Sequence, residues 1–112
     1  MSITEILYTD WDSAVTKADS AVVVEFWHQN CPTCKKIEPS VQELPGKLGK
    51  AKLIRLNVLM DRETRRLAIQ KGVIGTPTFK VYCRGNEVGE VVGLETLTDL
   101  AGTLNNILKE CL

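Results

Sequence analysis

The sequence has no excess of charge of either sign. Fourteen basic and fourteen acidic residues give a formal net charge of zero. Proteins that attract nucleic acid or an anionic membrane by charge present a basic field, which this composition does not supply. We therefore expect neither nucleic acid nor a membrane among the partners of this protein.

Long apolar runs are also missing from the chain. No stretch approaches the roughly 18 residues that a membrane-spanning helix requires. Residues 1–6 lack the basic and apolar regions of a secretion signal. These absences predict a cytoplasmic protein.

Internal repeats, low-complexity segments and linkers rich in Gly or Pro are absent as well. The 112 residues match the usual size of one domain. A domain of this size buries enough surface to fold without disulfide or metal cross-links. We expect a single domain over residues 1–112 that acts as a monomer.

Cysteine is too sparse for a disulfide-stapled secreted module, which is usually shorter and denser in cysteine. Two of the four cysteines, Cys31 and Cys34, form a C-x-x-C pair. Zinc requires four ligands, and Cys83, Cys111 and the single His28 supply no second close pair, so we expect no metal site. We expect Cys83 to be a small buried hydrophobe in a strand, and Cys111 to lie near a frayed terminus.

Runs of β-branched residues alternate with segments of helical periodicity. The expected strands cover residues 3–8, 21–27, 53–58, 78–83 and 87–92, and the expected helices cover 10–18, 31–44, 61–71 and 96–109. The last helix is expected to turn Leu97, Leu100, Leu104, Ile107 and Leu108 inward. The order β-α-β-α-β-α-β-β-α predicts an α/β protein with a mixed five-stranded sheet and four helices on its two faces.

The Cys31-Pro32-Thr33-Cys34 segment should open the second helix, because proline suits a first helical turn. A cysteine at a helix N-terminus is stabilised as a thiolate by the helix dipole and by unpaired N–H groups. Cys34 lies one turn further on the same face, so the two sulfurs can form a disulfide. A disulfide that closes such a small ring stabilises the fold little as a cross-link, which favours reversible exchange.

Glu25 interrupts an otherwise apolar strand. Burial should raise the pKa of this carboxyl group, because the charged form is costly to desolvate. Glu25 is therefore a candidate proton acceptor for Cys34.

Several spaced motifs are similar to those of the thioredoxin family and follow in the same order. They are Val24-Glu25-Phe26-Trp27, Cys31-Pro32-Thr33-Cys34, Pro39, Gly75-Thr76-Pro77-Thr78-Phe79 and Val92-Gly93. The resemblance spans nearly the whole chain and implies the thioredoxin fold. It also implies a reductase of protein disulfides, recharged by an upstream reductase, with no cofactor beyond the Cys31–Cys34 disulfide.

Carried over to this chain, the resemblance places Trp27 beside the dithiol, with Cys31 as the exposed nucleophile and Cys34 as the shielded resolving thiol. It makes Pro77 a cis-proline. The substrate segment would lie along the backbone of Thr76, with apolar surface from Ile74 and room left by Gly75 and Gly93. The expected substrate-binding residues are therefore Trp27, Ile74, Gly75, Thr76, Pro77 and Gly93.

Two departures leave alternatives open. Asn30 stands where thioredoxins typically carry tryptophan, and Pro32-Thr33 replaces their Gly-Pro. A glutathione-coupled or oxidising member of the superfamily is therefore an alternative, as is a non-enzymatic binding module with this fold. Arg55 stands where many members have lysine, and would either compensate the charge of Glu25 or cap a strand in solvent.

Overall fold

The computed structural model describes residues 3–111. Five strands form one mixed sheet in the order β1-β3-β2-β4-β5. The strands are β1 (Thr4–Glu5), β2 (Ala21–Trp27), β3 (Lys52–Asn57), β4 (Thr78–Cys83) and β5 (Asn86–Val92). Strands β1, β3 and β2 run parallel, while β4 and β5 are antiparallel to their neighbours. This is the predicted mixed sheet.

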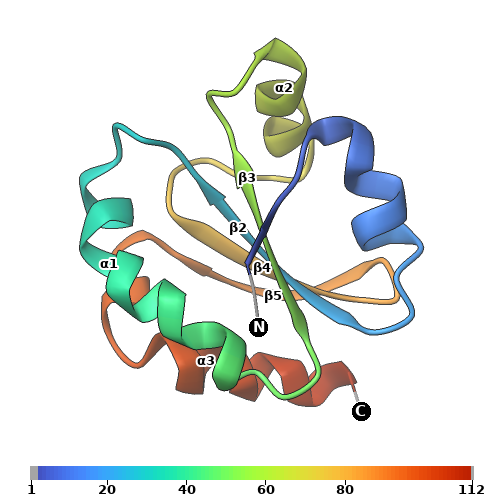
Figure 1. Ribbon diagram of the computed structural model, residues 1–112, viewed down its shortest axis with the longest axis vertical. Helices are drawn as coiled ribbons and strands as arrows, with labels where there is room; N and C mark the ends of the chain where they lie inside the picture. The colour runs from blue at the N-terminus through green and yellow to red at the C-terminus, as the bar shows by residue number, and fades with distance from the viewer. Residues whose placement is uncertain (1–2, 112) are drawn as a thin grey trace.

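Helices cover both faces of the sheet (Figure 1). Helices α1 (Pro32–Glu43) and α3 (Leu100–Leu108) lie on one face, and α2 (Arg62–Gln70) lies with the N-terminal helical turns on the other. Side chains of a strand alternate between faces. Accordingly, Val23 joins the core under α1 and α3, whereas Val24 joins the core under α2. Most of the predicted element boundaries agree with these to within two residues.

The N-terminal segment differs from the prediction. The strand is limited to β1, and a 3₁₀ turn (Tyr8–Asp10) and a π-helical turn (Asp12–Thr16) replace the expected regular helix. The Asp10 carboxylate accepts a hydrogen bond from the Leu7 N–H at 3.0 Å and starts the first turn early. Trp11 is buried against Phe26 and Tyr82, with ring centroids 6.1 and 5.3 Å apart. This packing, rather than helical periodicity, sets the shape of the segment.

The C-terminal helix begins later than predicted. A 3₁₀ turn (Gly93–Leu97) precedes it, and Asp99 caps α3 by accepting a hydrogen bond from the Gly102 N–H at 3.1 Å. Leu97 is 44% exposed, so its predicted inward position is wrong. Leu100 and Leu104 are buried as predicted, and Ile107 and Leu108 pack at the edge of the same core.

Cys83 and Cys111 are joined by a disulfide, with their Cα atoms 5.6 Å apart. The prediction of two unrelated thiols is therefore wrong. Helix α3 folds back along β5, and the 3₁₀ turn that follows it (Lys109–Cys111) reaches the end of β4. Two cysteines 28 positions apart meet only because of this packing.

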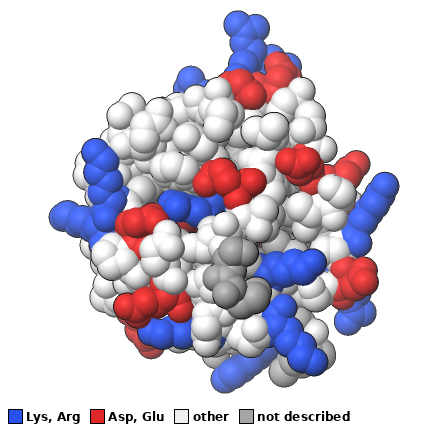
Figure 2. Space-filling view, viewed as in Figure 1, with Lys and Arg blue, Asp and Glu red and all other residues white. Residues whose placement is uncertain are grey.

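Charged side chains are interspersed on the surface. On the face shown in Figure 2, basic and acidic groups alternate and neither sign forms a continuous field. Within residues 3–111, none of the helices has the length and apolar character to cross a membrane.

Candidate functional site

The Cys31–Cys34 pair lies where β2 passes into α1. Cys31 is the N-cap of the helix, with extended backbone angles, and Pro32 is its first residue. The Cys31 sulfur accepts a hydrogen bond from the Cys34 N–H at 3.1 Å. The cap position therefore provides a backbone donor and the positive end of a helix dipole to this sulfur, as the sequence predicted.

The two cysteines form a disulfide, with Cα atoms 5.2 Å apart. Cys31 is 4% exposed and Cys34 is 3% exposed. The expectation of an exposed Cys31 is therefore wrong for this oxidised form. The bond and the capping interaction both draw the Cys31 sulfur against the first turn of α1.

The strand register brings the other predicted segments to the same end of the sheet. Phe26 is paired with Thr78, and Thr78 is paired with Val92. Trp27, Pro77 and Gly93, the next residues at this end, therefore lie at one edge. The Thr76–Pro77 peptide bond is cis, as the resemblance implied, and the Pro77 carbonyl accepts a hydrogen bond from the Gly93 N–H at 2.8 Å.

An apolar and open surface surrounds this edge. Ile74 is 96% exposed. Together with His28, Gly75 and Thr76, it lines a hollow of about 320 Å³ under α2. A Cβ atom built at Gly75 or Gly93 would meet nothing within 4 Å. The space that the resemblance reserves for a partner segment is therefore open at both glycines.

Glu25 is fully buried on the α1 face of β2. Desolvation by burial raises the pKa of its carboxyl group to about 7, against an opposing effect of the neighbouring Arg55 guanidinium. Arg55 Nε lies 2.8 Å from Glu25 Oε1. Neither carboxylate oxygen has a well-formed hydrogen bond, and the effect of burial on the pKa exceeds that of the ion pair.

Arg55 is held from two further sides. Its guanidinium donates two hydrogen bonds to the Glu38 carboxylate, at 3.2 and 2.9 Å. It also lies over the Trp27 ring, 4.4 Å from the centroid, and the indole Nε1 donates to Glu5 at 2.9 Å. Of the two interpretations of Arg55, charge compensation of Glu25 is the correct one.

Glu38 is a site residue that the sequence reasoning missed. It follows Cys34 by four positions, which places both side chains on one face of α1. That spacing, together with the basic Arg55 on β3, was the signal in the sequence that could have identified Glu38. Because the position of Arg55 was open, no partner for Glu38 was apparent.

A second hollow, of about 270 Å³, opens directly on Cys34. Trp27, His28, Glu38 and Arg55 are among the residues that line it. Arg55 therefore lies between this hollow, which we call the Cys34 hollow, and the buried Glu25. His28 also lines the hollow beside Ile74, and its Nδ1 accepts a hydrogen bond from the Asn30 N–H at 3.1 Å.

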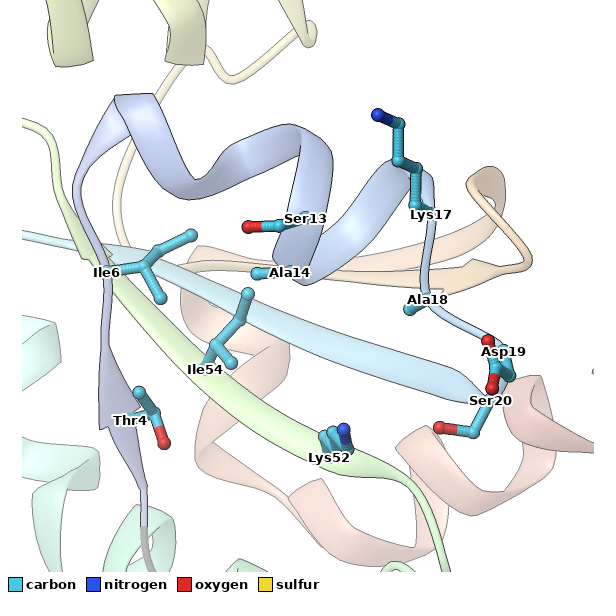
Figure 3. Close-up of a pocket in the computed structure, with 10 residues that line it drawn as sticks. All are labelled: Thr4, Ile6, Ser13, Ala14, Lys17, Ala18, Asp19, Ser20, Lys52 and Ile54. Atoms are coloured by element: carbon cyan, nitrogen blue, oxygen red, sulfur yellow. The ribbon is translucent and has the colours of Figure 1, made fainter.

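The hollow of about 390 Å³ between the N-terminal helical turns and β3 lacks such chemistry (Figure 3). Its charged lining residues are Lys17, Asp19 and Lys52, and no cysteine lines it. Among residues 3–111, no three His, Cys, Asp or Glu side chains are grouped so as to hold a metal ion.

Known proteins are similar to this chain over most of its length. The thioredoxin family model matches residues 2–106. A thioredoxin of Staphylococcus epidermidis is 36% identical over 110 residues, which cover 96% of this chain and all of that protein. A chloroplastic M-type thioredoxin of Brassica napus is 35% identical over 88% of this chain, which spans only 55% of that relative.

Solved structures agree with the sequence relatives. Thioredoxin f from spinach chloroplast superimposes with a TM-score of 0.81 and 25% identity, over 95% of this chain and 86% of that chain. The match thus extends across the sheet, the helices and the segment that contains the cysteine pair. This chain therefore belongs to the thioredoxin family of thiol-disulfide oxidoreductases.

Proposed function

We propose that this protein reduces disulfides in other proteins by dithiol exchange through Cys31 and Cys34. The observation that carries the proposal is the Cys31–Cys34 disulfide at the start of α1, next to an open edge for a partner segment at Gly75 and Gly93. The pair supplies two electrons itself, so the reaction requires no metal or other cofactor.

In the first step, the Cys31 thiolate attacks one sulfur of the substrate disulfide. The substrate S–S bond breaks, a mixed disulfide forms with Cys31, and the departing substrate sulfur takes up a proton. The Cys34 N–H, 3.1 Å from the Cys31 sulfur, and the dipole of α1 favour the thiolate.

In the second step, Cys34 attacks the Cys31 sulfur. The Cys31–Cys34 bond forms, the bond between Cys31 and the substrate breaks, and the second substrate sulfur leaves and takes up a proton, so the substrate gains two electrons and two protons overall. Cys34 must first lose its proton, and Glu25 is the proposed acceptor, either directly or through a water. A carboxyl group with a pKa of about 7 is well matched to this exchange near neutral pH.

The partner segment would bind as an extended strand across the sheet edge. Backbone groups of Thr76 would pair with it in the manner of β-augmentation, while Trp27 and the exposed Ile74 would contact its side chains. The cycle then needs an upstream reductase to return the Cys31–Cys34 disulfide to the dithiol. We place this cycle in the cytoplasm, where disulfides that exchange readily are kept reduced.

The test is to trap the mixed disulfide in cell extract with the Cys34→Ser variant. Without the resolving thiol, the second step fails, so partner proteins should remain covalently bound through Cys31 and be released by a reductant. Mass spectrometry of the released proteins identifies the substrates.

The matched control is the Cys31→Ser variant, which keeps Cys34 but has no nucleophile at the helix cap. It should trap at least tenfold less protein. Equal trapping by the two variants, or none by Cys34→Ser, would overturn the proposal. An equilibrium potential of the Cys31–Cys34 couple well above that of glutathione would instead indicate an oxidase.

A further inference from the structure

The proposed cycle uses only two of the four cysteines, and the other two form a disulfide elsewhere in the fold. Cys83 is the last residue of β4, and Cys111 is in the turn after α3. Their Cα separation of 5.6 Å is within the normal range for a disulfide. Cys111, like Leu108, packs against the edge of the core, so the folded chain holds Cys111 in place beside the end of β4.

The two disulfides lie at opposite ends of the central strand. Cys83 is paired with Ala21 at the start of β2, whereas the Cys31–Cys34 pair follows the end of β2 at Trp27. Six residue steps at about 3.3 Å each separate these ends by roughly 20 Å. Figure 1 shows the start of α1 and the C-terminal end of the chain on opposite sides of the molecule. Direct sulfur exchange between the pairs within one molecule is therefore excluded.

The two disulfides also close rings of different size. The cysteines are 3 positions apart in one pair and 28 apart in the other. Closing the larger ring removes more freedom from the unfolded chain, so folding favours the Cys83–Cys111 bond more strongly. A bond that is favoured by the fold is correspondingly harder to reduce.

We propose that Cys83–Cys111 is a structural disulfide of lower reduction potential, which remains oxidised while Cys31–Cys34 cycles and which anchors the end of α3 to the sheet. The bond forms when Cys83 and Cys111 pass two electrons and two protons to a small-molecule disulfide such as oxidised glutathione, which becomes two thiols. The comparison with a cycling Cys31–Cys34 pair rests on the proposed function, whereas the anchoring of α3 by the Cys83–Cys111 bond does not.

The first test is a redox titration of the wild-type protein in mixtures of reduced and oxidised dithiothreitol. Free thiols are alkylated at each ratio and located by peptide mass spectrometry. We expect Cys31 and Cys34 to become reactive first, and Cys83 and Cys111 to require at least a tenfold higher ratio of reduced to oxidised reagent. A common midpoint for the four cysteines would overturn the proposed difference.

The second test measures the anchor by thermal unfolding of the Cys83→Ala/Cys111→Ala variant. Under oxidising conditions its Tm should be about 10 °C below that of the wild type, because the larger ring is lost. When every disulfide is reduced, the wild type and the variant should have nearly equal Tm values. That equality would show that the Tm difference under oxidising conditions comes from the cross-link and not from the side-chain packing of Cys83 and Cys111. An equal Tm under oxidising conditions would overturn the anchoring role.

The same variant separates this proposal from the proposed function. Its initial rate of disulfide reduction should stay within about twofold of the wild type, because the substituted residues lie beside the start of β2, at the end away from Cys31 and Cys34. The control Cys31→Ser/Cys34→Ser should lose reduction and keep the Tm difference between oxidising and reducing conditions. Failure of the trapping experiment would leave these thermal results unchanged.

Discussion

Glu25 combines complete burial with an ion pair that does not satisfy it. Both carboxylate oxygens lack a well-aligned hydrogen bond, although Arg55 Nε is 2.8 Å away. Much of the Arg55 guanidinium is committed to Glu38. The charge of Glu38 itself also raises the pKa of Glu25, after burial as the main cause. The neutral carboxyl group is therefore the favoured form of the folded protein below about pH 7.

This pKa predicts how stability depends on pH. The carboxyl group of Glu25 titrates at about 7 in the folded chain and near its ordinary value of 4.5 when unfolded. Between these values the unfolded chain ionises first, so the free energy of unfolding should fall as pH rises, by about 3 kcal/mol in total. Urea unfolding at pH 4.5, 6 and 7.5 measures this decrease.

The Glu25→Gln variant is the control for the pH series, since it cannot ionise and has nearly the same shape. The free energy of unfolding of the variant should not show the fall that the ionisation of Glu25 causes. The values for wild type and variant should therefore diverge between pH 4.5 and 7. Parallel curves for the two proteins would show that Glu25 does not titrate in this range.

At the scale of elements, helix α3 lies close against strand β5. A Cβ atom placed on Gly89 of β5 would lie 2.7 Å from Ile107 Cγ2 of α3. Ile107 packs at the edge of the core that contains Leu104. The absence of a side chain at Gly89 thus lets the helix lie close to the strand, and positions the turn that contains Cys111.

Substituting Gly89→Ala should therefore separate the two elements. We expect a loss of about 1–3 kcal/mol of stability from overpacking, measured as a lower urea midpoint. The Gly89→Ala/Ile107→Ala double variant should lose less stability than the sum of the two single variants, because Ile107→Ala removes the obstructing methyl group. Gly46→Ala, where a Cβ meets nothing within 4 Å, should change the midpoint little. Additive losses in the Gly89 and Ile107 double variant would contradict the contact.

For the whole molecule, basic and acidic charges balance. The formal net charge is zero, and the face shown in Figure 2 mixes both signs. Long-range steering of a charged partner is therefore weak. Encounter with a substrate should depend on the apolar and backbone surface near Ile74.

The second-order rate constant for reduction of a protein disulfide should consequently change little with salt. Between 50 and 500 mM NaCl we expect less than about a threefold change, because no large field is available to be screened. Stopped-flow measurement under pseudo-first-order conditions gives this constant. A decrease of tenfold or more would indicate that charge does guide the encounter.

The sequence by itself determined the features that depend on local chemistry. The apolar run of β2 required a central strand, Pro32 opened a helix at the cysteine pair, and Gly72, with φ of +84°, closed α2. Asp99 was also a readable cap signal that the periodicity of the preceding leucines obscured. Such features depend on neighbours within a few residues, whose spacing the chain itself sets.

Tertiary structure decided the features that depend on distant partners. Neither the Cys83–Cys111 bond nor the contact of Arg55 with Glu38 follows from local spacing, because each needs two elements to pack in one orientation. The irregular turns around Trp11 were likewise set by contacts with Phe26 and Tyr82. Burial and pairing arise only when separate elements meet, so the partners of a residue are settled by the completed fold.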